Sequence, residues 1–110
     1  MRELVDLLKV MADESRLKII FALEKKPACV CELANFLKLS QATVSSHLKQ
    51  LRQAGMVDYK KDGKWVEYFL SENENIRNLT VQMKLFIKNK DQFEKEMNNV
   101  LTINRECLSK

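Results

Sequence analysis

Three cysteines carry the most distinctive chemistry of this 110-residue chain. Cys29 and Cys31 are separated by one residue and follow Pro27, and Cys107 lies near the C-terminus. The pattern after the proline predicts a short helix from about Cys29 to Leu37. The N-terminus of a helix stabilises anions, so thiols placed there should ionise more easily than a thiol in solution. Thiolates bind soft, thiophilic ions in preference to Mg²⁺ or Ca²⁺, and the three cysteines are therefore candidate ligands.

The spacing of the pair sets a geometric condition on that site. Residues i and i+2 of a regular helix point about 200° apart, so Cys29 and Cys31 cannot both reach one ion from within the helix. They converge only if Cys29 lies in the non-helical lead-in, and binding would then pull on the turn into the next helix. Two alternatives stay open: the pair are small core residues, and Cys107 is a buried or idle cysteine.

The next segment predicts a helix over about 41–54. Ser40 is a good N-cap, because its hydroxyl can accept a hydrogen bond from a backbone N–H of the first turn, and Gly55 can end the helix in the left-handed conformation. One apolar stripe falls at i, i+4 and i+7: Val44, Leu48 and Leu51.

The rest of this helix can read DNA, because it carries no acid that would repel phosphates and has many short or hydrogen-bonding side chains suited to base edges in the major groove. The predicted DNA-contacting residues of this helix are Gln41, Ala42, Thr43, Ser45, Ser46, His47, Lys49 and Gln50. His47 lies near the apolar stripe on the helical wheel, so packing against a neighbouring helix is its alternative role.

The helix at 41–54 and the short amphipathic segment before it predict a helix-turn-helix, with the second helix as the reader. The period then changes, and residues 56–70 predict a β-hairpin with Asp62-Gly63 as its two-residue turn. Three lysines crowd its tip and can reach backbone phosphates: Lys60, Lys61 and Lys64. The order of these elements predicts a mainly α winged helix-turn-helix, although an ordinary helical hairpin followed by a solubilising β-hairpin would show similar patterns.

The two ends of the chain predict amphipathic helices with more apolar surface than a small winged core can cover. Leu4, Leu8 and Met11 mark the first of them. The C-terminal pattern, over about 73–108, contains no Gly or Pro and has a polar stretch at 88–92 that should bend or break it. We therefore expect a homodimer formed through the N- and C-terminal helices, which would present two reading helices to an operator with two-fold symmetry.

Composition sets the broad class of the protein. A length of 110 residues predicts one domain, 1–110, and 45% hydrophobic with 31% charged residues is typical of a globular chain. The net charge is +4, and six cations against two acids between Lys38 and Lys64 account for all of it, which favours a nucleic-acid partner. No membrane-length or signal-peptide segment is evident, so we expect a cytoplasmic protein with reduced cysteines and no membrane partner.

Three stretches resemble the ArsR (arsenic repressor) family: Ala12 to Ile20, Cys29 to Ala34 and Ser40 to Val57. The resemblance extends from the first helix to Tyr68 in the wing. It implies a winged-helix homodimer that represses transcription until a metal, metalloid or redox signal releases it from its operator. It also implies that the thiol pair is the sensing site, with As(III) or Sb(III) as the inducer and no obligatory cofactor.

The sequence departs from the family pattern at several positions. Family members with this thiol pair often have a third cysteine one turn later, where this chain has Ala34. Arsenite prefers three thiolates, so Cys107 could complete the site within or across protomers. The zinc-sensing branch needs histidine ligands on the last helix, and His47 is the only histidine. The cadmium/lead branch also uses N-terminal cysteines, and residues 1–28 contain none.

Other functions remain as alternatives. A redox or persulfide sensor of the same fold would use Cys29 or Cys31 with Cys107. A small thiol oxidoreductase is disfavoured, because the chain lacks a Cys-x-x-Cys motif and the βαβ context, and no constellation for hydrolytic catalysis is evident; we therefore predict that the protein is not an enzyme. A winged helix that binds protein instead of DNA is disfavoured by the basic segment 38–64.

Overall fold

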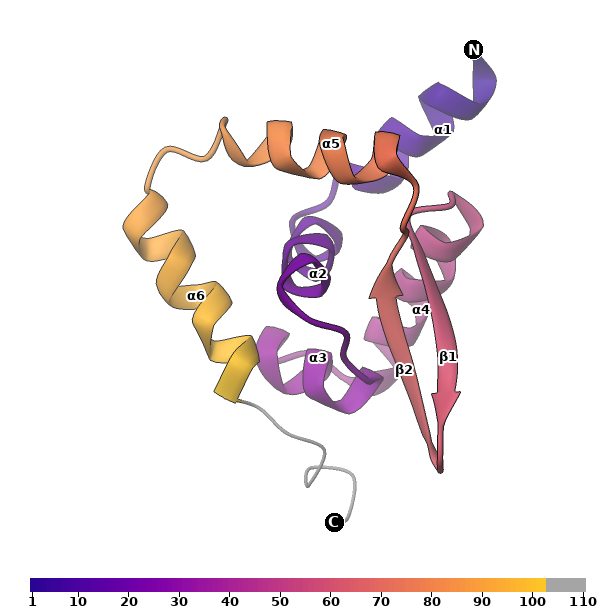
Figure 1. Cartoon of the computed structure of the whole chain (residues 1–110), viewed down its shortest axis with the longest axis vertical. Helices are drawn as coiled ribbons and strands as arrows, with labels where there is room; N and C mark the ends of the chain where they lie inside the picture. The colour runs from indigo at the N-terminus through magenta and orange to yellow at the C-terminus, as the bar shows by residue number, and fades with distance from the viewer. Residues whose placement is uncertain (103–110) are drawn as a thin grey trace.

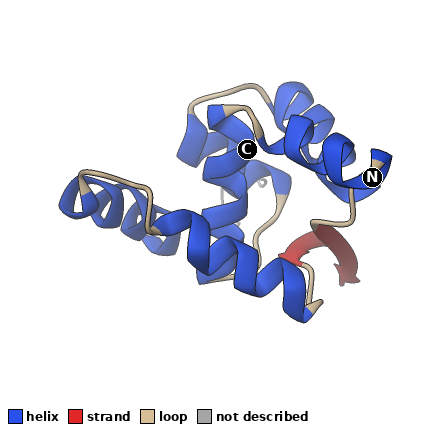
Figure 2. Ribbon diagram, turned by 90° about the horizontal axis from the view of Figure 1, so that it is seen from above, coloured by secondary structure: helices blue, strands red, loops and turns tan. Residues whose placement is uncertain are grey.

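The computed structural model describes the backbone of residues 1–102 and the side chains of residues 1–98. Helices form the body of the molecule, and a single two-stranded antiparallel hairpin lies at one side (Figures 1 and 2). The elements, in chain order, are α1 (Arg2–Met11), α2 (Glu14–Lys25), α3 (Val30–Leu37), α4 (Gln41–Gln53), β1 (Val57–Asp62), β2 (Trp65–Leu70), α5 (Glu74–Lys84) and α6 (Lys90–Thr102). This is the predicted winged helix-turn-helix architecture.

The core is built around α2, which lies in the middle of the molecule with the other elements around it (Figure 1). Ile19 and Ile20 of α2 are completely buried. Completely buried side chains of the same core cluster come from α3, α4, the open end of the hairpin and α6: Leu33, Val44, Leu48, Leu51, Met56, Leu70 and Met97. The predicted apolar stripe of the reading helix therefore faces inward, which leaves its polar side for solvent.

Polar side chains fix where the helices begin. The carboxylate of Asp13 accepts a hydrogen bond from Arg16 N at 3.0 Å, and the hydroxyl of Ser40 accepts one from Thr43 N at 3.1 Å. Each satisfies a backbone donor that has no partner within the helix. Gly55, with φ +81°, follows the C-cap of α4 in the left-handed conformation, as predicted.

The hairpin forms where it was predicted, but its turn is shifted by one residue. Asp62 pairs with Trp65, so Gly63 and Lys64 form the turn, and the prediction of Asp62-Gly63 is wrong. Gly63 has φ +63°. Two-residue turns of the type that places glycine first need this positive φ, and their twist matches that of the strands, so the glycine selects the register.

The C-terminal pattern forms two helices with a break at residues 85–89, close to the predicted polar stretch. Helix α6 turns back over α2, where the rings of Phe21 and Phe93 meet edge to face at 5.3 Å. Ion pairs Lys25–Glu94 and Lys18–Glu96, at 3.1 and 3.7 Å, lie along the same contact. Among the described residues, no helix is long and apolar enough to cross a bilayer.

Candidate nucleic-acid interface and thiol site

The polar face of α4 is open to solvent over most of its length. The exposed residues among those predicted to contact DNA are Gln41, Ala42, Thr43, Ser45, Ser46 and Lys49, and Gln50 is half-buried. The Ser40 cap holds the first turn in place, and its hydroxyl also lies 2.8 Å from the hydroxyl of Thr43. A rigid helix N-terminus with short side chains is suited to close approach to base edges.

His47, which is also predicted to contact DNA, instead makes a contact within the protein. It is half-buried, and its Nδ1 accepts a hydrogen bond from Arg16 Nε at 3.1 Å. Arg16 also donates from Nη1 to the carbonyl of Val10, so this side chain joins the end of α1 to α4 through α2. The arrangement favours the alternative helix-packing role of His47.

The three lysines of the wing, which is the hairpin of β1 and β2, are exposed to solvent. Lys60 Nζ lies 3.8 Å from Glu67 Oε1 on the opposite strand, and Lys64 Nζ lies 4.8 Å from the centre of the Trp65 ring. Both contacts are at the surface, where such pairs contribute little free energy and can rearrange. Lys61 faces the groove between the wing and α4.

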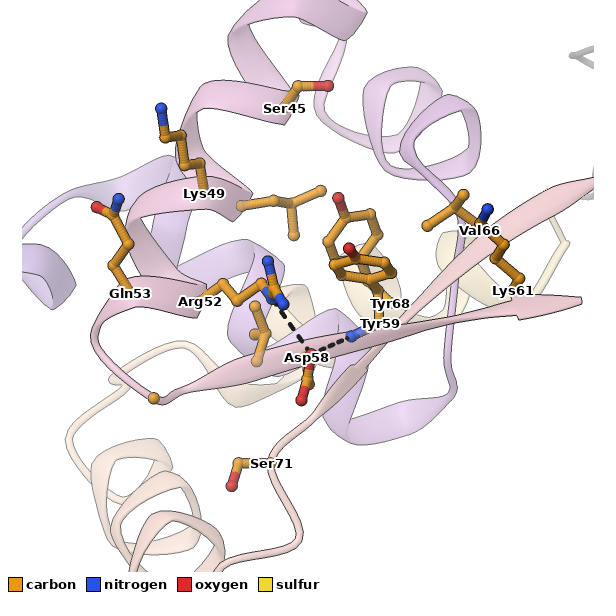
Figure 3. Close-up of a pocket in the computed structure, with 13 residues that line it drawn as sticks. Ser45, Lys49, Arg52, Gln53, Asp58, Tyr59, Lys61, Val66, Tyr68 and Ser71 are labelled. Carbon is orange, nitrogen blue, oxygen red and sulfur yellow. Dashed lines mark hydrogen bonds and ion pairs between the residues drawn. The ribbon is translucent and has the colours of Figure 1, made fainter.

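That groove has a volume of about 900 Å³ and lies between one side of α4 and strand β1 (Figure 3). Three cations line it, Lys49, Arg52 and Lys61, and Asp58 is the only acid among its lining residues. Asp58 accepts hydrogen bonds from the Tyr59 backbone N–H at 2.8 Å and from Arg52 Nε at 3.2 Å. The Tyr59 hydrogen bond, followed by that of Arg52, lowers the pKa of the Asp58 carboxyl below its usual value.

Arg52 is a residue of this groove that was not among the site residues predicted from the sequence. Its guanidinium lies 4.4 Å above the centre of the Tyr59 ring, and the Tyr59 and Tyr68 rings lie 5.5 Å apart (Figure 3). Burial is the main cause that raises the pKa of the Tyr68 hydroxyl. The spacing of Lys49 and Arg52 at i and i+3, which puts both on one helix face, was the signal that could have identified it.

The thiol pair lies at the N-terminus of α3, on the side of the molecule facing away from α5 (Figure 1). Cys29 is the N-cap residue, with the extended angles φ −90° and ψ 167°, and its N–H donates to Glu32 Oε1 at 3.0 Å. The geometric condition on the pair is therefore met: Cys29 precedes the helix and Cys31 lies within it. Both side chains are buried, with 2% and 3% of the residue surface exposed.

Cys31 takes part in a disulfide in the structure. Cys107 lies outside the described residues. Within residues 1–98, no group of three or more His, Cys, Asp or Glu side chains is placed to hold a metal ion. Two described thiols alone are thus an incomplete set for an ion that prefers three.

A short β-bridge connects the segment just before Cys29 to strand β2 of the wing. Ala28, which precedes Cys29, exchanges two backbone hydrogen bonds with Tyr68 of β2, at 3.0 and 2.8 Å. Because Tyr68 also packs against Tyr59, a continuous set of contacts leads from the thiols to the Arg52 side chain on α4.

Comparison with known proteins agrees with this geometry. Residues 13–59 match the family described as bacterial regulatory protein, arsR family. The solved structure of reduced HlyU from Vibrio cholerae is 37% identical, with a TM-score of 0.68 over 79% of this chain and 92% of that one. The chain belongs to the ArsR family. Its family is one of regulatory proteins, which supports the prediction that it is not an enzyme.

Two curated relatives carry names that mention resistance to a metal or metalloid. The cadmium resistance transcriptional regulatory protein CadC of Listeria innocua is 49% identical over 72 residues, which is 64% of this chain and 60% of the relative. The arsenical resistance operon repressor of Escherichia coli K12 is 46% identical over 68 residues, 61% of this chain and 58% of the relative. This ArsR-family chain thus spans about three fifths of the curated relatives that it matches.

Proposed function

We propose that this chain is a single-domain, homodimeric transcriptional repressor that binds a two-fold symmetric DNA operator in the cytoplasm. The observation that carries the proposal is the exposed, acid-free face at the start of α4, next to a wing with three exposed lysines. The contact residues predicted from the sequence would bind bases and phosphates there, and His47 would position α4 through its hydrogen bond with Arg16. Family membership and the relatives named as repressors support this function.

The proposed dimer rests on apolar side chains that the single chain leaves uncovered. Leu4 and Leu8 of α1 are 52% and 51% exposed. Leu85 and Phe86, which follow α5, are 62% and 86% exposed. In Figure 1, α1 lies at the upper right and the turn that follows α5 at the upper left. An exposed apolar surface of this kind is typical of a protein–protein interface, and a second copy would cover it with the same residues.

The proposed inducer is arsenite or antimonite, bound by reduced Cys29 and Cys31 with Cys107 as a candidate third ligand. An ion that joins a residue ahead of α3 to one inside it would displace the lead-in at Ala28. The bridge from Ala28 to Tyr68 would pass that displacement to the wing. Coupling of about 1–3 kcal/mol between inducer and DNA, typical of allosteric proteins, corresponds to roughly 5–150-fold weaker operator binding.

The decisive experiment is a release assay. Reduced protein is bound to a labelled duplex of its own upstream DNA, and arsenite, antimonite, cadmium and zinc are titrated separately while anisotropy is followed. We expect arsenite and antimonite to release the wild type, and Cys29→Ser/Cys31→Ser to bind DNA normally without being released. Cys107→Ser, tested in parallel, should respond at higher arsenite concentration if it is the third ligand. Release of the double variant by arsenite would show that the assigned site is wrong.

A redox input is the second candidate function, and one observation favours it. Cys31 is disulfide-bonded in the structure, and a similar solved structure is described as reduced HlyU. With hydrogen peroxide as oxidant, two thiols would form one disulfide and the peroxide two waters. In the same release assay, dissociation by peroxide with a mass loss of two hydrogens identifies this input, whereas release by arsenite with all thiols reduced identifies the first.

A further inference from the structure

The groove between α4 and the wing contains a guanidinium that pairs with a carboxylate and stacks on a ring of the neighbouring strand. Arg52 Nε faces Asp58 Oδ1 at 3.2 Å, and its Cζ lies 4.4 Å above the Tyr59 ring. Asp58 is fixed in turn by the Tyr59 N–H. An arginine that is stacked on an aromatic ring and paired through Nε loses little further rotamer freedom when its Nη groups bind an anion.

The surroundings of Arg52 favour an anion. Its side chain is 51% exposed, so a ligand can reach it without rearrangement of the core. Lys49, one turn earlier on α4, and Lys61 on β1 line the same groove and add two further positive charges. In Figure 3, Lys49 and Gln53 flank Arg52 along the helix, and Asp58 and Tyr59 approach it from the strand.

We propose that Arg52 binds a backbone phosphate of DNA in this groove, and that Asp58 and Tyr59 position its guanidinium. The inference rests on the proposed DNA-binding function and adds a contact between those of the reading helix and those of the wing tip. The planar guanidinium carries five N–H donors, of which Nε is used by Asp58, so the Nη donors are the ones offered to phosphate oxygens.

Asp58 has a second effect in this arrangement. Its carboxylate attracts the same guanidinium that the phosphate must attract, and it repels the phosphate itself. Asp58→Asn keeps an oxygen that can accept from Arg52 and from the Tyr59 N–H, but it removes the charge. The phosphate therefore gains affinity when Asp58 is neutralised, and only while Arg52 is present to receive it.

The test compares variants by operator affinity and its salt dependence. Arg52→Gln should raise the Kd for operator about tenfold, since hydrogen bonds to charged groups are strong. The slope of log affinity against log salt should become shallower by about one, as expected for one lost phosphate contact. Asp58→Asn should lower the Kd by about 2- to 5-fold, the range of a surface ion pair, and that gain should vanish in the Arg52→Gln background.

Matched controls separate local from general charge effects. Asp62→Asn removes an acid from the same strand near the hairpin turn, and its effect should be the same with or without Arg52. Lys95→Gln removes an exposed cation from α6, away from the groove, and should leave the salt slope unchanged. Thermal unfolding of each variant confirms that it is folded.

The outcomes distinguish this inference from the proposed function. If the wild type binds no duplex DNA, the proposed function fails. If the wild type binds and Arg52→Gln binds with an unchanged slope, only the phosphate contact is overturned. A purely structural ion pair between α4 and β1 predicts that Arg52→Gln and Asp58→Asn both weaken binding or both leave it unchanged, and either result overturns the assignment.

Discussion

Single side chains decide where the helices of this protein begin, and their protonation matters for stability. Asp13 caps α2 by accepting from Arg16 N at 3.0 Å. This backbone hydrogen bond is the main cause that lowers the pKa of the Asp13 carboxyl from 3.8. A carboxyl whose pKa is lower in the folded state stabilises the fold above its unfolded pKa, and this contribution is lost as pH falls through the folded pKa.

The change Asp13→Asn tests this at the residue scale. Asparagine is also a good N-cap, so the variant should keep most of the cap at neutral pH, whereas Asp13→Ala should lose about 1 kcal/mol of unfolding free energy. In urea unfolding measured from pH 7 to pH 2, the unfolding free energy of the wild type should exceed that of Asp13→Asn at neutral pH. This difference should decrease below about pH 3.8. A constant difference between these two proteins at every pH would contradict the assigned cause.

Residue spacing also explains which site residues could be anticipated. The exposed positions on α4 follow from the 3.6-residue period and the buried stripe at Val44, Leu48 and Leu51, both of which are local. Arg52 belongs to the site only because β1 returns beside α4 and brings Asp58 and Tyr59 to it. The inward position of His47 likewise depends on Arg16, 31 residues earlier.

At the scale of elements, the position of α6 depends on its packing against α2. A chain segment without Gly or Pro could have continued as one long helix from α5, yet it breaks at 85–89 and α6 folds back on α2. Phe93, packed edge to face on Phe21, and the fully buried Met97 hold it there. The reversal buries apolar side chains that a straight helix would leave in solvent.

A double-mutant cycle on Phe21 and Phe93 tests this packing. Each of Phe21→Leu and Phe93→Leu should lower the free energy of unfolding by roughly 1–3 kcal/mol, because the smaller side chain leaves part of the core unfilled and removes the ring pair. The double variant should lose less than the sum by about 0.5–1.5 kcal/mol, the additional free energy of an edge-to-face pair. Urea denaturation measures all three variants. Strictly additive losses would show that the rings do not interact.

At the scale of the whole molecule, the single chain leaves apolar side chains of α1 and of the segment after α5 exposed, and the proposed dimer would cover them. In Figure 1, α1 lies at the upper right and the segment after α5 at the upper left, so the predicted dimer through the N- and C-terminal helices would have to cover two separate surfaces. Two reading helices brought together by a two-fold axis would contact successive major grooves.

The variant Leu85→Glu tests the dimer. Leu85 is 62% exposed, so a charge there should leave the fold of one chain intact while an isologous interface would bury two like charges. We expect a dimer for the wild type and a monomer for the variant in sedimentation velocity, with operator affinity lower by at least about tenfold because only one half-site is held. Asn98→Glu, at an exposed position of α6, is the charge-matched control. A Leu85→Glu dimer of unchanged affinity would place the interface elsewhere.

Local sequence was sufficient for the elements and for much of the DNA-binding face. The caps at Asp13 and Ser40, the left-handed Gly55 and the buried stripe of α4 depend on residues within a few positions of one another, so their effect does not change with the rest of the fold. The hairpin follows from local sequence for the same reason, although its turn lies one residue later than predicted, because Gly63 supplies the positive φ that the first turn position needs.

Contacts between distant segments decided the remainder. The bridge from Ala28 to Tyr68, the Arg52 stack on Tyr59 and the return of α6 over α2 join residues that no local pattern relates. They form because the apolar side chains of separate elements must share one core, and that packing fixes which polar side chains meet at its edges. The sequence alone thus determined the cysteines and their spacing. The contacts that connect the thiol segment with α4 depend on tertiary packing.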